Sequence, residues 1–224
     1  MLTFNFSELS QEQVQSIVKL HEKGTVPGKW DDMMLACTDQ ERQQLQFFTL
    51  GLLNRRVVAM NEATIWSRAI YPLLMLAEQG HVQAWSQVLL RAHYPRFALE
   101  GIVDGVLANS IAGRVEAPYL VVLEAKRGIE AKDPQFQLYG EMLAAAWLNW
   151  QQTAETPQEI FGCYTVSDSW TFARGIVEEL EAEQPVMTVE FSREYVEKIE
   201  AETILQILKF IVAKSTNASR GGKQ

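Results

Sequence analysis

The sequence has few cysteines and no long apolar run. Only two cysteines occur among its 224 residues, Cys37 and Cys163, and neither has a second Cys or a His at zinc-binding spacing. This argues against a disulfide framework and predicts a reducing compartment, the cytoplasm. No apolar run reaches the ~20 residues that a membrane span requires. The N-terminal segment MLTFNFSELSQEQ also lacks the basic and apolar regions of a secretory signal. We therefore expect a cytoplasmic protein that does not contact the membrane.

The sequence also lacks an excess of positive charge. Its formal net charge of −8 at pH 7 argues against a protein that binds nucleic acid unaided through a broad basic surface. Most of this acidity lies in residues 151–224, away from the chemically interesting residues described below. Neither GxxxxGK[ST] nor GxGxxG occurs, which disfavours an α/β enzyme for small anionic metabolites.

What the sequence does contain is a mixture of helix and strand patterns, typical of an α/β protein. Residues 1–44 are polar and predict an N-terminal helical extension, with a helix capped by Ser10. Residues 45–214 predict one α/β domain. Residues 215–224 predict a disordered tail.

Individual elements of the domain follow from periodicity and from turn residues. A long helix is expected over 39–80, with a break or kink at Asn54 and Pro72. The other expected elements are a strand in 94–108, a turn-rich link over 109–118, a strand over 119–126, a helix over 133–152, a hairpin over 159–173 turning at 167–169, a strand over 186–191 and a helix over 192–214.

Two of the expected strands carry charged residues inside apolar runs. Asp104 lies in the first strand, and Glu124 and Lys126 close the second. Side chains alternate along a strand, so Glu124 and Lys126 share a face, and Asp104 shares one with Glu100. An unpaired buried charge is costly, and a divalent cation held by the two acids would offset that cost. We therefore expect Asp104 and Glu124, with the backbone carbonyl of Ala125, to bind Mg²⁺ or Mn²⁺.

This pattern resembles the PD-(D/E)xK nuclease superfamily, which has the restriction-endonuclease-like fold. Asp104 followed by Glu124-Ala125-Lys126 is similar to its signature, with Val103 in place of the usual proline. The resemblance implies a mixed β-sheet flanked by helices and Mg²⁺-dependent cleavage of phosphodiesters. It also implies that Lys126 assists the attacking water or the transition state.

The resemblance extends on both sides of these strands, over roughly residues 55–212. Gln135 and Tyr139 are similar to the QxxxY element of RecB-like nucleases, which implies that they position the lysine, the water or the phosphate. The segment NEATIWSRAIYPLL is similar to a helix of the N-terminal nuclease domain of type I restriction subunits. In that comparison, Glu62 would be an outer acid that approaches the metal through water.

Several alternatives stay open at the sequence level. Gln137 replaces Gln135 as the inward residue if the helix start differs by a residue or two. Glu100 is either a second site acid or an ion-pair partner of Arg91 or Arg96. A strand that carries ExK is often a solvated face with a cross-strand ion pair.

The predicted function is a Mg²⁺-dependent nuclease acting on DNA. Because the chain is small and acidic, we expect its targeting to depend on a homodimer or on a partner protein. The alternative is a non-catalytic binding or regulatory protein that retains the nuclease-like fold.

Overall fold

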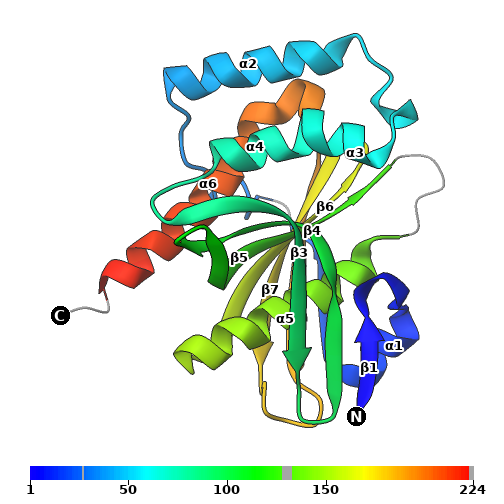
Figure 1. The fold of residues 1–224 in the computed structure, drawn as a ribbon. Coiled ribbons are helices and arrows are strands. Elements are labelled where there is room, and N and C mark those ends of the chain that lie inside the picture. The colour runs from blue at the N-terminus through cyan, green and yellow to red at the C-terminus, as the bar shows by residue number, and fades with distance from the viewer. Residues whose placement is uncertain (27, 128–132, 222–224) are drawn as a thin grey trace.

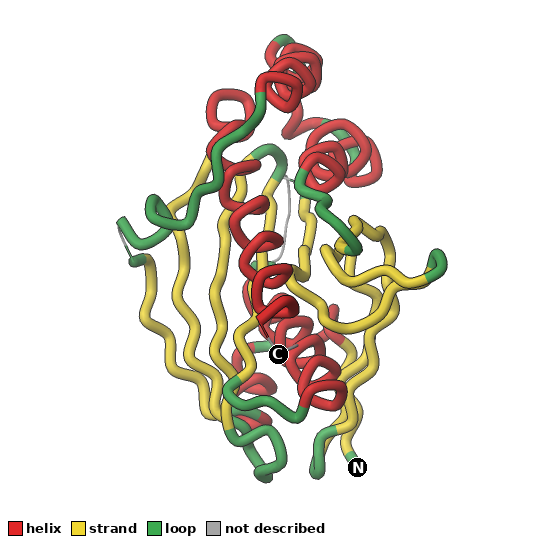
Figure 2. Tube along the Cα trace, turned by 90° about the vertical axis from the view of Figure 1, so that its left-hand side faces the viewer, coloured by secondary structure: helices red, strands yellow, loops and turns green. Residues whose placement is uncertain are grey.

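The chain folds into a mixed β-sheet with helices on both of its faces (Figures 1 and 2). The computed structural model describes residues 1–26, 28–127 and 133–221, with side chains described as far as Lys214. Within these residues, eight strands form one sheet in the order β1-β4-β5-β6-β7-β8-β2, and β3 pairs with β4. The strands are β1 (Leu2–Asn5), β2 (Lys19–Thr25), β3 (Val82–His93), β4 (Phe97–Ile111), β5 (Arg114–Lys126), β6 (Gln158–Val166), β7 (Ser169–Glu178) and β8 (Val186–Val196).

Two layers of helices bury the two faces of the sheet and create two cores (Figure 1). The first core lies between the sheet and α1 with α5, and the second lies between the sheet and α2–α4 with α6. The helical segments are η1 (Phe6–Glu8), α1 (Gln11–Ile17), α2 (Asp39–Leu53), η2 (Val57–Ala59), α3 (Glu62–Ile65), the π-helix η3 (Trp66–Ile70), α4 (Tyr71–Leu76), α5 (Gln135–Thr153) and α6 (Glu197–Gly221). The predicted mixed α/β architecture is therefore confirmed. No described helix is long and apolar enough to cross a membrane.

The prediction of a helical extension over residues 1–44 is wrong, because this segment supplies two strands of the sheet. The cap is confirmed: Ser10 and Gln13 form a capping box at the start of α1. The helix ends at Ile17, however, and β2 then pairs in parallel with β8, while β1 pairs in parallel with β4. β1 alternates apolar and polar residues, but over only four positions, and β2 is almost entirely polar and exposed, so neither gives a strong strand signal.

The long helix predicted over 39–80 is several shorter segments. The predicted break at Asn54 is confirmed, because Asn54 caps the C-terminus of α2. After it, the chain forms η2, α3, η3 and α4 in succession, and Pro72 lies in the first turn of α4. The backbone stays helical through Ile70 and Tyr71, and the proline, which has no N–H to donate, directly follows the π-helix η3, a widened turn of the kind that accommodates such an interruption.

Strand β3 was not predicted, although its buried residues alternate along the strand. The link predicted over 109–118 is also mostly strand, since β4 and β5 extend into a tight hairpin at Ala112-Gly113. Both of these residues have positive φ, as two-residue hairpin turns require.

The second half of the domain follows the prediction more closely. Helix α5, the hairpin of β6 and β7, strand β8 and helix α6 all form. Helix α6 starts at Glu197, later than predicted, and Ile199 in its first turn is 78% exposed. Its backbone continues to Gly221, which corrects part of the disordered tail predicted over 215–224; residues 222–224 lie outside the described part.

Candidate active site

The candidate site lies at a gap in the sheet beside strand β4. One edge of β4 pairs with β3 along most of its length. Its other edge is shared: residues 105–111 pair with β5, and residues 97–100 pair with β1. Asp104 falls between these two stretches. Its Oδ2 accepts a hydrogen bond of 2.8 Å from the backbone N–H of Ala125, so the carboxylate bridges β4 to β5 where the two backbones separate.

An irregularity in β3 directs Asp104 toward this gap. Ala84 packs in the second core, whereas Val88, four residues later, packs in the first. Gln87, between them, has φ of 53°, a left-handed conformation that is uncommon outside glycine. Strand β4 changes face at the same level, and Gln87 Nε2 donates a hydrogen bond of 3.1 Å to Asp104 Oδ1. The Asp104 side chain is therefore held from both neighbouring strands.

Glu124 and Lys126 lie at the end of β5 and contact each other. Lys126 Nζ forms an ion pair with Glu124 Oε1 and donates a hydrogen bond of 3.3 Å to Gln137 Oε1 of α5. Gln137 Nε2 in turn donates to Glu124 Oε2 at 2.6 Å and to Glu141 Oε1 at 3.1 Å. Glu124 is only 1% exposed and Glu141 is fully buried, so this network lies in the interior, between β5 and α5.

The electrostatics of the site are dominated by carboxyl groups held close together. Burial, and then the charge of Asp104, raise the pKa of Glu124 to about 7. Burial and the charge of Glu124 raise the pKa of Glu141 well above its usual range. Burial alone would lower the pKa of Lys126, but its pairing with Glu124 outweighs this and raises the pKa. The charge of Lys126 thus interacts with three acids, most strongly with Glu124 and also with Asp104 and Glu62.

Glu62 adds a further acid at the rim of the site. It is the first residue of α3, which opens at Asn61, whose side chain accepts a hydrogen bond of 2.9 Å from the N–H of Thr64. Partial burial and the charge of Asp104 raise the pKa of Glu62, and the charge of Lys126 opposes the effect. The charges of Asp104 and Lys126 therefore act on Glu62, while the role of Glu62 as an outer acid stays a prediction.

The structure does not bring Gln135 and Tyr139 to this cluster. Gln135 Nε2 donates a hydrogen bond of 2.8 Å to Glu22 Oε1, and Tyr139 OH donates one of 2.5 Å to the same oxygen. Gln135 also hydrogen-bonds Tyr139. Both residues thus face β2, and Gln137, the alternative considered from the sequence, holds Glu124 and Lys126 instead.

Sequence reasoning missed Glu141 altogether. It is the single charged residue in the run YGEMLAAAWL, and it follows Gln137 by four positions, which places the two on one face of a helix. That spacing was a usable signal. Glu100 is explained more simply, because it forms an ion pair with Arg91 at 3.4 Å on the neighbouring strand.

The donor set of the site fits a hard dication. Each carboxylate oxygen of Asp104 and Glu124 accepts from a protein donor, and Glu124 also hydrogen-bonds with Glu141. An ionised carboxylate has about four lone-pair positions, so some acceptor capacity remains. The buried Oε2 of Glu141 has no hydrogen-bond partner in the described residues. In the described part of the chain, no three His, Cys, Asp or Glu side chains are grouped so that they could hold a metal ion together. A hard dication at this site would therefore have at most two carboxylates as protein ligands, and solvent would have to supply the others.

An open pocket adjoins the site on the side of β6. It has a volume of about 550 Å³ and is lined in part by Glu22, Gln135, Tyr164 and Thr171. Tyr164 pairs directly with Glu124 in the register of β5 and β6, so the pocket begins one strand away from the acids.

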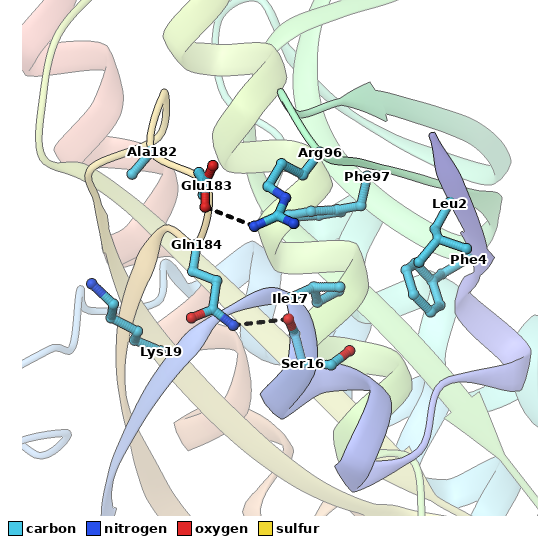
Figure 3. A pocket seen from close by; sticks show the side chains of 10 residues that line it. All are labelled: Leu2, Phe4, Ser16, Ile17, Lys19, Arg96, Phe97, Ala182, Glu183 and Gln184. Atoms are coloured by element: carbon cyan, nitrogen blue, oxygen red, sulfur yellow. Dashed lines mark hydrogen bonds and ion pairs between the residues drawn. The ribbon is translucent and has the colours of Figure 1, made fainter.

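Another pocket, of about 560 Å³, is formed by β1, α1, the start of β4 and the segment before β8 (Figure 3). Arg96 pairs with Glu183 at 2.7 Å, and Gln184 donates to the carbonyl of Ser16 at 2.8 Å. These contacts satisfy its charged and polar groups within the protein, so it is a poor candidate for catalysis.

Comparison of the chain with models of known protein families finds no match, and comparison with curated proteins finds no significant match.

Proposed function

We propose that the protein is a Mg²⁺-dependent phosphodiesterase, a nuclease that acts on DNA, with the restriction-endonuclease-like arrangement of the PD-(D/E)xK superfamily. The observation that carries this proposal is the meeting of Asp104, Glu124 and Lys126 at the gap between β4 and β5. On the other edge of β4, beside Asp104, lies the irregular segment of β3, and backbone irregularities of this kind cluster at functional sites.

Asp104 and Glu124 would hold the ion, with the carbonyl of Ala125 as a further ligand. When bound, Mg²⁺ supplies electrostatic stabilisation of the phosphate and lowers the pKa of a bound water. Glu62 would contact the ion through water, at the rim of the site. All of these are hard oxygen donors, so Mn²⁺ would substitute.

Lys126 has two roles in this proposal. In the free protein its ammonium group neutralises Glu124, which would otherwise be a buried, unpaired charge. During the reaction it would turn toward the phosphate, where a cation stabilises the charge that develops in the transition state. Gln137 contacts Lys126 and Glu124 together, so it would position both.

The test is cleavage of plasmid and single-stranded DNA in Mg²⁺ or Mn²⁺ by wild type and by Lys126→Ala. We expect cleavage by wild type and a loss of about 10²-fold or more in the variant, the size expected when a transition-state charge contact is removed. Lys214→Ala is the matched control, because Lys214 also pairs with a glutamate of the sheet, Glu159, at 2.6 Å. Equal cleavage by wild type and Lys126→Ala would reject the proposed site.

A second candidate function is a non-catalytic binding module. The observation that favours it is that the oxygens of Asp104 and Glu124 already have protein partners, including Lys126. The two functions differ in metal binding. The nuclease predicts that Mg²⁺ raises the Tm of wild type but not that of Asp104→Ala, because only a ligand that binds the native site stabilises the protein. Absence of both cleavage and metal stabilisation would support the module.

A further inference from the structure

Helix α2 exposes a row of large apolar side chains. Phe47 is 75% exposed, Leu50 is 59% exposed and Leu53 is 48% exposed. They recur every three residues, which keeps them on one side of the helix. Figure 1 shows α2 as the outermost layer of the structure on the side of the second core. A contiguous apolar surface of this kind is typical of a protein–protein contact.

Grooves flank this row on both sides. One has a volume of about 540 Å³ and lies between α2 and the segment of η3 and α4, where Arg68 and Pro72 line it. The other, of about 370 Å³, lies between α2 and α6 and is lined by Ile199 and Ala201. Helices pack with the ridges of one in the grooves of the other, so a ridge flanked by two grooves is suited to contact a second helix.

The charges at the two ends of α2 indicate which helix would pack against this apolar row. Asp39 begins the helix with its side chain 96% exposed, and the helix is followed by Arg55 and Arg56. Asp39 pairs only with Arg42 of its own helix, and in the part of the chain that the structure describes neither Arg55 nor Arg56 forms an ion pair through its side chain.

Phe47 lies midway along the chain between Asp39 and Arg55. A two-fold axis beside Phe47 would therefore place Asp39 of each copy opposite Arg55 and Arg56 of the other. Two α2 helices arranged in this way are antiparallel, so their helix dipoles also oppose each other favourably. A parallel arrangement would put the two arginine pairs together, and like charges disfavour it.

We propose that this face, formed by Phe47, Leu50 and Leu53, is a homodimer interface in which α2 packs antiparallel against α2 of a second copy. Phe47 and Leu50 supply the buried centre, Leu53 lies between this centre and the arginines, and the acid–arginine contacts at both ends set the direction. A two-fold interface of this type is self-complementary, and two-fold symmetry is the commonest symmetry among soluble oligomers. This inference concerns a different surface from the candidate active site and does not depend on nuclease activity.

The first test is sedimentation equilibrium of the full chain over a concentration series. We expect wild type to dimerise and Leu50→Asp to remain monomeric, because a buried carboxylate in the centre of the interface has no partner. Ile111→Asp is the matched control: Ile111 is 48% exposed at the tip of a hairpin, so this variant should dimerise like wild type. A wild type that is monomeric throughout, or a Leu50→Asp variant that dimerises, overturns the proposal.

The second test uses charge reversal to distinguish a second copy of this chain from any other partner of the surface. Arg55→Glu with Arg56→Glu should raise the dissociation constant of the dimer about tenfold or more, because acids would then face Asp39. Adding Asp39→Arg to this double variant should restore dimerisation, since the reversed charges again match across the axis. Circular dichroism confirms that each variant folds. Failure of the triple variant to recover affinity would reject the antiparallel arrangement.

Discussion

Gln137 is the residue that connects the charged groups of the candidate site. Its amide donates to Glu124 and Glu141, and its oxygen accepts from Lys126. We predict that Gln137→Ala lowers the free energy of unfolding by about 1–3 kcal/mol, because it leaves buried carboxyl oxygens without a donor. Gln135→Ala, one half-turn away, should cost less, since its partner Glu22 is exposed to solvent. Urea unfolding of the two variants tests this, and equal losses would contradict it.

The acids and the lysine of the site were predictable from the sequence, but the amide that holds them was not. Asp104, Glu124 and Lys126 are conspicuous because each is a charge inside an apolar strand. The choice between Gln135 and Gln137 depends on how α5 is rotated about its axis. That rotation is set by tertiary packing, since almost every residue from Leu138 to Trp147 is buried and the helix has no single apolar stripe.

The packing of η3 on β4 depends on a glycine. A Cβ added at Gly105 would lie 2.4 Å from Cη2 of Trp66, whose indole N–H is held by Ser86 Oγ at 3.1 Å. We predict that Gly105→Ala destabilises the protein by about 1–3 kcal/mol, the usual cost of overpacking. Gly51→Ala is the control: its Cβ meets nothing within 4 Å in α2, so it should stabilise the helix by about 0.5–1 kcal/mol. Thermal unfolding of both variants at equal concentration provides the measurement.

Among the elements, those that bury a regular apolar face were predictable, and those that depend on distant partners were not. The hairpin of β6 and β7 was identified because its strands are rich in aromatic and β-branched residues. Strand β2 was assigned to a helix because it lies at the edge of the sheet, with exposed, polar side chains. Its strand conformation comes from hydrogen bonding to β8, more than 160 residues away, which no local pattern reveals.

At the scale of the whole molecule, the N-terminal segment supplies two strands of the sheet, far apart from each other. β1 extends the edge of β4 next to the candidate site, and β2 closes the opposite edge on β8. Residues 1–44 are therefore integrated with the rest of the structure. This long-range pairing also explains why a boundary near residue 44 looked reasonable from composition alone, since the polar character of the segment reflects its position at the edges of the sheet.

The stability of the molecule should depend on pH through acids buried without a cation. Burial raises the pKa of Glu197 to about 8, despite the hydrogen bond of 2.9 Å that Trp170 Nε1 donates to it. A carboxyl group whose folded pKa is raised binds more protons in the folded state than in the unfolded state. Its stabilising effect is complete below the unfolded pKa of about 4.5 and is lost as the pH rises through 8.

We therefore predict that Glu197→Gln becomes progressively more stable than wild type between pH 5 and pH 8, by up to about 1.4 kcal/mol per pH unit. The amide keeps an oxygen for Trp170 and carries no charge to bury. Glu200→Gln should differ from wild type in another pH range, because pairing with Arg193 lowers the pKa of Glu200 and the ionised form is the one that stabilises. This variant should be less stable than wild type by a constant amount between pH 5 and pH 8, and the difference should shrink only as the pH falls below 4.5. Urea unfolding at several pH values measures both slopes. If the difference between Glu197→Gln and wild type did not change with pH, Glu197 would have to be ionised in the native protein, and the buried hydrogen bond to Trp170 would then have to compensate for its charge.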